Sequence, residues 1–223
     1  MELFERTIGL IGLDNFNKLQ KAHVLVCGIG GVGGTAVEAL VRSGIGHITI
    51  VDFDTVSASN INRQILFTSK DIGQMKVEIA RKKLEDINPN CEVKIINQRI
   101  DENFNLEEKY DYIIDAIDDV KGKKTLAKLA SINKIPLIIS LGMANKIDPS
   151  KVKIIRLDKT TDDPLAKKIR YEFKKEGIET NKIMTVNSNE VQIKDGATLN
   201  SMMFVPSSAG LNLASFVIQE IIK

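Results

Sequence analysis

Short apolar runs and helix-like patterns follow one another in a regular order over the first 140 residues of the chain. Apolar runs of strand length predict buried strands, and longer stretches with apolar residues three or four positions apart predict helices. Strands that alternate with helices are typical of a parallel sheet covered by helices on both faces. The pattern therefore predicts an α/β fold of the Rossmann-like, doubly wound type with a mainly parallel sheet.

The predicted elements of this first half are closely spaced. A helical preamble over 1–21 carries an apolar stripe at Leu10, Leu13, Phe16 and Leu19. Strands are predicted over 22–27, 47–51, 93–96, 112–116 and 135–140, and helices over 35–42, 75–87 and 122–133. The expected buried positions of the last two helices are Val77, Ala80, Leu84, Ile87, Leu126, Leu129, Ala130 and Ile132.

The alternation weakens after residue 140, which indicates an extension of different design. A strand is predicted over 152–156, and a helix over 163–176 with proline at its first position. The polar segment 178–201 is predicted as a loop or hairpin, 203–205 as a short strand and 209–222 as a closing amphipathic helix. We expect one domain, 1–223, with a nucleotide-binding half (1–140) and a substrate-facing part (141–223) that adds antiparallel strands and the closing helix.

A glycine-rich turn directly follows the first predicted strand. Gly28, Gly30 and Gly33 fit the G-x-G-x-x-G pattern, and a helix follows whose N-terminal amides would face an anion. Asp52 ends the next strand, 19 residues after Gly33, which suits a carboxylate that binds ribose hydroxyls. The alternative is a purely structural turn, but the strand, the helix and the acid together favour a nucleotide site.

The residues after Asp52 favour a triphosphate over a dinucleotide such as NAD. Backbone amides suffice for a diphosphate, whereas Arg63 and Lys76 follow soon after the acid as if to neutralise a longer phosphate chain. A lysine is mildly unfavourable at a helix start, so a bound phosphate would explain Lys76, although an ordinary solvated lysine stays an alternative. Neither histidine is placed for hydride transfer.

Two carboxylates follow the fourth predicted strand. Asp118 and Asp119 come where open α/β sheets bind ligands, and either could hold Mg²⁺ through oxygen atoms. The alternative is an N-cap for the next helix, a role that suits Asp119. One of the two can cap the helix while the other binds the metal ion.

Composition narrows the class of protein. Hydrophobic residues make up 43% and charged residues 27% of the chain, as in globular proteins, and the net charge of +2 gives no global attraction to nucleic acid. Two isolated cysteines, Cys27 and Cys91, form no C-x-x-C pair, which indicates a reducing, cytoplasmic setting. The N-terminus lacks a signal-peptide core, and no apolar run is long enough for a membrane span.

Basic residues concentrate in one segment, 151–175. Nine basic residues stand there against four acidic ones. Such a patch beside a nucleotide site could follow an RNA backbone. The alternative, which this pattern supports equally, is a charge-rich helix that merely faces solvent.

In its motifs the chain resembles the ubiquitin-activating-enzyme-like (ThiF/MoeB/HesA) adenylating superfamily over nearly its whole length. The matching motifs are Gly28-x-Gly30-Gly31-Val32-Gly33, Asp52-Phe53-Asp54-x-Val56, Ser59-Asn60-x-x-Arg63-Gln64, Gly73-x-x-Lys76 and Asp115-Ala116-x-Asp118. Within the superfamily it most resembles the tRNA threonylcarbamoyladenosine dehydratase branch. The features of that branch include Ile87-Asn88-Pro89, Lys146-Ile147-Asp148-Pro149, Asp162-Asp163-Pro164-Leu165-Ala166 and Phe204-Val205-Pro206.

The resemblance implies a set of residue roles. The residues expected to bind ATP are Gly28, Gly30, Gly31, Gly33, Asp52, Asp54, Asn60, Arg63, Gln64, Lys76 and Asp118. Asp118 would also hold Mg²⁺, and Arg6 would reach across a homodimer interface into the partner's site. The residues expected to serve catalysis are Arg6, Arg63, Lys76 and Asp118. A monovalent cation is compatible with this pattern.

The same resemblance implies the reaction and its partners. The substrate would be N6-threonylcarbamoyladenosine in tRNA, whose carboxylate attacks the α-phosphorus of ATP before the carbamoyl group displaces AMP and closes a ring. The alternative is adenylation of the C-terminal glycine of a ubiquitin-like sulfur-carrier protein. Relatives of that kind usually carry zinc-binding C-x-x-C pairs, which this chain lacks, so no zinc is expected. A nucleotide-sensing protein without turnover and an NAD oxidoreductase are further alternatives, and an accessory sulfur-transfer protein is compatible with the resemblance.

Overall fold

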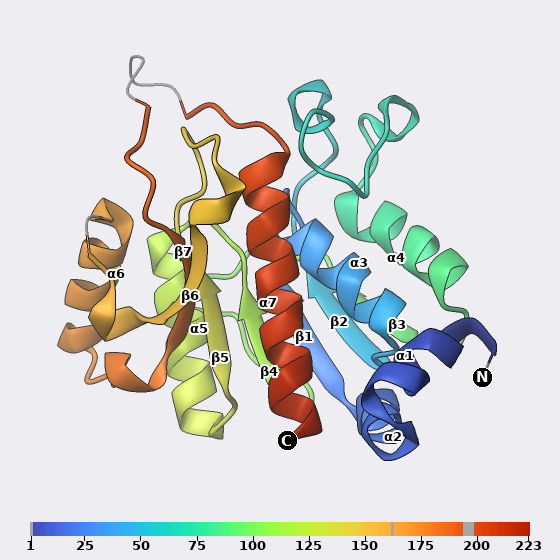
Figure 1. The fold of residues 1–223 in the computed structure, drawn as a ribbon. Helices are drawn as coiled ribbons and strands as arrows, with labels where there is room; N and C mark the ends of the chain where they lie inside the picture. Colours follow the sequence, from blue (N-terminus) through green and yellow to red (C-terminus); the bar gives the residue numbers. More distant parts are fainter. Residues whose placement is uncertain (1, 162, 194–198) are drawn as a thin grey trace.

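A computed structural model describes residues 2–161, 163–193 and 199–223, in which seven strands form one sheet between layers of helices (Figure 1). The strands are β1 (His23–Cys27), β2 (His47–Val51), β3 (Glu92–Ile96), β4 (Tyr112–Asp115), β5 (Leu137–Ser140), β6 (Val152–Arg156) and β7 (Met184–Ser188). The helices are α1 (Glu5–Ile11), α2 (Leu13–Lys21), α3 (Gly33–Ser43), α4 (Lys76–Ile87), α5 (Val120–Asn133), α6 (Pro164–Lys175) and α7 (Phe204–Ile222). None of the helices described is long and apolar enough to cross a membrane.

The sheet confirms the predicted fold class. Its strand order is β3-β2-β1-β4-β5-β7-β6, and every neighbouring pair is parallel except β6 and β7. The direction of winding reverses between β1 and β4, so the loops that leave these two strands diverge and open a crevice at their carboxyl ends. The glycine-rich turn lies at this switch point because it directly follows β1.

The two faces of the sheet bury different apolar residues. Along β1, Val24 and Val26 belong to one core cluster and Leu25 to the other, because successive side chains of a strand point to opposite faces. Helices α3, α4 and α7 cover the first face and α5 and α6 the second (Figure 1). Both faces of the central strands are therefore buried, which explains why these strands read as continuous apolar runs.

A buried ion pair supports the loop that follows β4. The Nζ atom of Lys123 donates to Oδ1 of Asp115 and to the backbone oxygen of Ser140, both at 2.9 Å, and neither charged side chain is exposed. Burial raises the pKa of the Asp115 carboxyl, while the neighbouring lysine acts to lower it. Oδ1 also accepts the backbone N–H of Ile117 at 3.2 Å, so the pair fixes the start of the loop that carries Asp118.

Two details of the helical predictions are wrong. The preamble is helical as predicted, but its single apolar stripe is wrong, because Gly12, with φ of 81°, separates α1 from α2. Leu10 is 85% exposed as a result, and only the later members of the stripe, Phe16 and Leu19, are buried. Ile132 of α5 is also exposed, at 76%, whereas the predicted core positions of α4 are buried apart from the half-buried Ile87.

The C-terminal part departs most from the prediction. Segment 178–201 is not only a loop, since it contains β7, which pairs in parallel with β5 inside the sheet. The antiparallel pairing predicted for the extension is that of β6 with β7. The strand predicted at 203–205 is wrong, because α7 begins at Phe204. Residues 194–198 of the predicted loop lie outside the described residues.

Candidate active site

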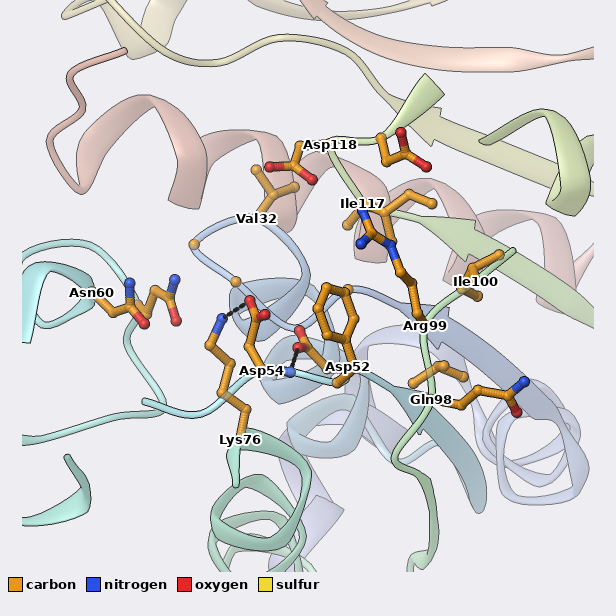
Figure 2. A pocket seen from close by; sticks show the side chains of 18 of the residues that line it. Val32, Asp52, Asp54, Asn60, Lys76, Gln98, Arg99, Ile100, Ile117 and Asp118 are labelled. Carbon is orange, nitrogen blue, oxygen red and sulfur yellow. Dashed lines mark hydrogen bonds and ion pairs between the residues drawn. The ribbon is translucent and has the colours of Figure 1, made fainter. Parts of the chain in front are cut away.

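A cavity of about 510 Å³ opens at the carboxyl ends of β1, β2, β3 and β4 (Figure 2). The loops after these four strands, together with the first residue of α4, supply its lining. The lining residues that the sequence singles out are Gly28, Gly30, Gly31, Asp52, Asp54, Asn60, Arg63, Gln64, Lys76, Asp118 and Asp119. Residues that are far apart along the chain thus meet in one site, as the strand-end rule for open α/β sheets predicts.

The turn after β1 requires glycine at two positions. Gly28 has φ of 81°, and a Cβ atom there would lie 2.9 Å from the backbone oxygen of Ala116. A Cβ atom on Gly33 would lie 1.8 Å from the backbone oxygen of Gly28, so α3 can begin this close to β1 only with glycine. In the described structure the backbone N–H groups of Gly30 and Gly31 have no acceptor, and they lie at the start of α3 where the helix dipole favours an anion.

Asp52 is fixed where β2 ends. Its Oδ2 accepts the backbone N–H of Ile29 and its Oδ1 accepts that of Asp54, each at 2.9 Å. The residue is 8% exposed and borders the cavity. Because each carboxylate oxygen can accept a second hydrogen bond, this arrangement holds the side chain in place and leaves acceptor capacity for ribose hydroxyls.

Lys76 lies at the first position of α4, with only 4% of its surface exposed. Its Nζ donates to Oδ2 of Asp54 at 2.8 Å, a contact that Figure 2 shows beside the glycine turn. Its backbone N–H donates to the backbone oxygen of Asp54 at 3.0 Å. The lysine is therefore held over the cavity by an acid and is not an ordinary solvated surface lysine.

Arg63 provides a second cation at the same wall of the cavity. Its Nη1 donates to the backbone oxygen of Ser59 at 2.7 Å and to Oδ1 of Asn62 at 3.0 Å. No carboxylate of the described residues forms an ion pair with it. These contacts orient the guanidinium without neutralising it, so its charge is available to a phosphate.

Two amide side chains complete this wall. Asn60 uses its Oδ1 to accept the backbone N–H of Ser57 at 3.1 Å, which stabilises the loop. Gln64 is 5% exposed and lines the cavity, and its Oε1 has no hydrogen-bond partner in the described structure. A buried amide oxygen without a partner costs free energy, so a donor from a bound molecule would stabilise it.

The two acids after β4 have different roles. Asp119 caps α5, accepting the backbone N–H of Gly122 on its Oδ2 at 2.9 Å. Asp118 is exposed at the cavity, and its side chain has no partner among the described residues (Figure 2). Asp119 is therefore the N-cap of α5, and the Asp118 carboxylate stays available to a metal ion.

Several lining residues were not among the site residues predicted from the sequence. Phe53 follows β2 and is 48% exposed, and the guanidinium carbon of Arg99 lies 5.1 Å from the centre of its ring. Gln98, Arg99 and Ile117 continue this side of the cavity, next to Asp52 (Figure 2). Together they give this side of the cavity an aromatic ring, aliphatic carbon and a guanidinium group. The sequence did offer one signal for Gln98, Arg99 and Ile117. They follow β3 and β4 closely, and the carboxyl ends of these strands meet at the same edge of the sheet.

Three further residues of interest lie outside the cavity lining. Arg6 is exposed on α1, which packs against α2 at the end of the sheet where β1 begins. Cys27 and Cys91 are both buried. Burial raises the pKa of the Cys27 thiol well above its usual value and that of Cys91 to about 12. Neither thiol is suited to act as a nucleophile.

Comparison with known proteins connects this geometry to one family. The model of the ThiF family matches residues 4–169. The tRNA threonylcarbamoyladenosine dehydratase of Bacillus subtilis (strain 168) is 37% identical over 246 residues, covering 99% of this chain and 94% of the relative. The dehydratase of Escherichia coli (strain K12) is 39% identical over 174 residues, covering 77% of this chain and 65% of that protein.

Solved structures agree over the whole fold. The crystal structure of the E. coli tRNA N6-threonylcarbamoyladenosine dehydratase, TcdA, in complex with ATP has a TM-score of 0.94 and 34% identity, and covers 99% of this chain and 93% of that one. The complex of the same protein with AMP has a TM-score of 0.93 and 33% identity, with 99% and 94% covered. The antiparallel β6, β7 and the closing helix therefore belong to a fold already seen with nucleotides bound.

Proposed function

The chain belongs to the ThiF family, and from this premise we propose that it catalyses the ATP-dependent cyclisation of N6-threonylcarbamoyladenosine in tRNA. Its function would be that of an adenylating enzyme of the ligase type. The observation that carries the proposal is the cavity at the sheet's switch point, where a glycine turn, the fixed carboxylate of Asp52 and two cations meet. The full-length similarity to named dehydratases supports this substrate over the other substrates of the family.

We assign the nucleotide contacts from the geometry of the cavity. The free backbone N–H groups of Gly30 and Gly31 would bind phosphate oxygens, and Asp52 would accept the ribose hydroxyls. Arg63 and Lys76 would neutralise the triphosphate. The side of the cavity that carries Phe53 and Arg99 would take the adenine base. AMP and pyrophosphate are the expected nucleotide products.

The carboxylate of the threonylcarbamoyl group would attack the α-phosphorus, forming an oxygen–phosphorus bond as pyrophosphate leaves. Attack by the modification's own carbamoyl group on the acyl carbon then closes the ring and releases AMP and a proton. Activation is needed because a carboxylate oxygen leaves poorly. Both cysteines are buried with raised thiol pKa values, which agrees with a route that needs no protein nucleophile.

A divalent cation fits the charge of the site. The cavity lining includes four carboxylates against three cationic side chains, Arg63, Lys76 and Arg99, so it does not by itself neutralise a triphosphate. No group of three or more His, Cys, Asp or Glu in the described part of the chain could hold a metal ion alone. Mg²⁺ would therefore be held by Asp118 together with phosphate oxygens, and when bound it would offset charge on the phosphates.

We further propose a homodimer in which Arg6 of one subunit completes the site of the other. Arg6 is exposed and lies outside the cavity lining of its own chain, so a contribution to catalysis requires a second copy. The C-terminal part, 141–223, would face the tRNA, and the enzyme would work in the cytoplasm. An accessory sulfur-transfer protein is compatible with this scheme and is not required by it.

Conversion of ATP to AMP tests the proposal directly. The protein is incubated with tRNA that carries threonylcarbamoyladenosine and, in parallel, with a ubiquitin-like sulfur-carrier protein, and nucleosides are then measured by mass spectrometry. We expect AMP formation and a loss of one water from the modified nucleoside only with tRNA. AMP formation that depends on the carrier protein would instead favour the sulfur-carrier alternative. Binding of ATP without turnover in either reaction would favour a nucleotide sensor.

A further inference from the structure

The structure divides the basic segment 151–175 into charges used within the fold and charges left to solvent. Arg156 donates to both carboxylate oxygens of Asp158 at 3.0 Å. Arg170 donates to the backbone oxygen of Thr160 at 2.9 Å and to the Thr160 hydroxyl. These two arginines therefore stabilise the fold locally and contribute little to an external patch.

Of the seven other basic residues of the segment, four lie on the outer face of α6, which we define as Lys167, Lys168, Tyr171, Lys174 and Lys175. All five residues are exposed, and at 100° per residue they share the side opposite the buried Ala166, Ile169 and Phe173. No carboxylate of the described residues forms an ion pair with Lys167, Lys168 or Lys174. Figure 1 shows α6 at the β6 end of the molecule, away from α4.

The acidic residues near α6 are turned toward α5. Glu176 pairs with Lys124 at 3.0 Å and with Lys128 at 2.6 Å, and Glu172 lies 3.9 Å from Lys124 and 3.6 Å from Lys175. Glu176 is therefore used between the two helices, and Glu172 is shared between Lys124 of α5 and Lys175 of the outer face. The charged residues of the outer face are therefore all positive, whereas a helix that only faces solvent commonly carries charges of both signs.

An aromatic ring stands within this face. Tyr171 is 60% exposed, and the Nζ atom of Lys175 lies 4.2 Å from the centre of its ring. The ring is accessible to a partner, and the lysines around it favour a partner that carries negative charge. Proteins that follow a nucleic-acid strand combine basic side chains for the phosphates with aromatic rings on which bases stack.

We propose that the outer face of α6 is a docking surface for the body of the RNA substrate, with the lysines on phosphates and Tyr171 against an unpaired base. This inference rests on the proposed tRNA-modifying function and adds a second contact point away from the nucleotide cavity. It explains how a chain with a net charge of only +2 can hold a polyanion, because the attraction is local.

Binding of threonylcarbamoyl-modified tRNA at several salt concentrations tests the surface. The variant Lys167→Ala/Lys168→Ala/Lys174→Ala is compared with Lys21→Ala/Lys82→Ala/Lys109→Ala, which removes the same net charge from exposed positions on other elements. We expect the α6 variant to lower the slope of log Kd against log salt by about one for each of these lysines that binds a phosphate in the wild type. The control variant should keep the wild-type slope.

Tyr171 gives an independent readout. Tyr171→Ala should weaken tRNA binding by about tenfold, whereas Tyr171→Phe, which keeps the ring, should bind tRNA like the wild type. The affinity for ATP should stay unchanged in all these variants, because none of the residues lines the cavity.

The outcomes separate this inference from the proposed function. If the wild type cyclises the modified nucleoside but the α6 triple variant binds tRNA like the control triple variant, the docking surface is wrong and the proposed function stands. If the wild type shows no cyclisation, the proposed function itself fails. If the α6 variants change the oligomeric state in solution and leave tRNA affinity intact, the face belongs to a second copy of the chain, and the RNA assignment is overturned.

Discussion

The Nζ atom of Lys76 lies 2.8 Å from Oδ2 of Asp54, although the two residues are 22 positions apart in the sequence. The lysine is almost fully buried, whereas the Asp54 side chain is 49% exposed at the cavity. An ammonium group has three donors, and only one of them is used in this contact. The acid therefore holds the lysine at the cavity and leaves donors for a phosphate chain.

Lys76→Ala should slow the ATP-dependent reaction. It removes a charge-assisted contact to phosphate worth about 1.5–3 kcal/mol, or roughly ten- to a hundredfold in rate, and Arg63→Ala should act similarly. The measurement is AMP formation at saturating modified tRNA. Lys82→Ala, an exposed lysine on the same helix, is the matched control and should retain the wild-type rate. Near-normal rates in both cavity variants would mean that the triphosphate binds elsewhere.

Substitutions of Asp118 and Asp119 should affect two different quantities, the Mg²⁺ dependence of the reaction and the stability of the fold. Asp119→Ala removes the N-cap of α5 and should lower the free energy of unfolding by about 1 kcal/mol in denaturant titrations. Asp118→Asn should change that free energy by less than about 0.5 kcal/mol, because its side chain is exposed and makes no contact within the described structure. It should instead raise the Mg²⁺ concentration needed for half-maximal AMP formation. An unchanged Mg²⁺ dependence would remove Asp118 from the metal site.

Mixing two inactive variants tests the proposed role of Arg6. In a dimer formed from one Arg6→Ala subunit and one Lys76→Ala subunit, the first subunit's cavity keeps Lys76 and receives Arg6 from its partner. Random reassociation of equal amounts should therefore recover about a quarter of the wild-type activity from two proteins with little activity alone. If Arg6 served its own subunit, neither cavity of the mixed dimer would be complete, and mixing would recover nothing.

Asp71 should make stability depend on pH in the acid range. Burial acts to raise the pKa of its carboxyl, but hydrogen bonds from Lys83 and Thr68 outweigh burial and hold the pKa below its usual value. Folding therefore favours the charged form, so the stabilisation is present above the unfolded pKa of about 3.9 and is lost as pH falls through the folded value.

Asp71→Asn should thus lower the free energy of unfolding by about 1–3 kcal/mol near neutral pH, with a difference that shrinks on acidification. Unfolding titrations at a series of pH values measure it. Asp86→Asn, an exposed acid on α4 with no partner in the described structure, is the control and should follow the wild-type curve. A difference between Asp71→Asn and the wild type that stays constant down to strongly acid pH would contradict the assignment.

The cavity wall that would receive adenine shows what local patterns miss. The sequence places Asp52, Arg63 and Lys76 in motifs with recognisable spacing, and the structure gathers all three around one cavity. Phe53 belongs to one of these motifs but was given no role, and Arg99 belongs to none, because their ring and guanidinium meet only when β2 and β3 lie side by side. Contacts of that kind depend on strand order, which no local pattern encodes.

The basic segment 151–175 is a second example. Its charges look alike in the sequence, yet Arg170 is used on Thr160 and Arg156 on Asp158, while the lysines of the α6 outer face are exposed to solvent. Helical periodicity predicts which residues share a face of α6. Which carboxylates neutralise them is decided by the packing of α6 on α5.

By itself, the sequence determined the Rossmann-like half and the glycine turn and predicted a nucleotide site there, because these depend on local periodicity and on two glycines, Gly28 and Gly33, that leave no room for a Cβ atom. Only the tertiary structure decided that the polar segment containing Thr185 and Asn187 is a strand inside the sheet, between β5 and β6. In the sequence, polar residues of this kind are typical of a loop. In the structure they are buried, and Thr185 Oγ1 donates to the backbone oxygen of Ile155 on β6 at 2.7 Å. Burial of a polar strand depends on partners that are distant along the chain, and the fold alone supplies them.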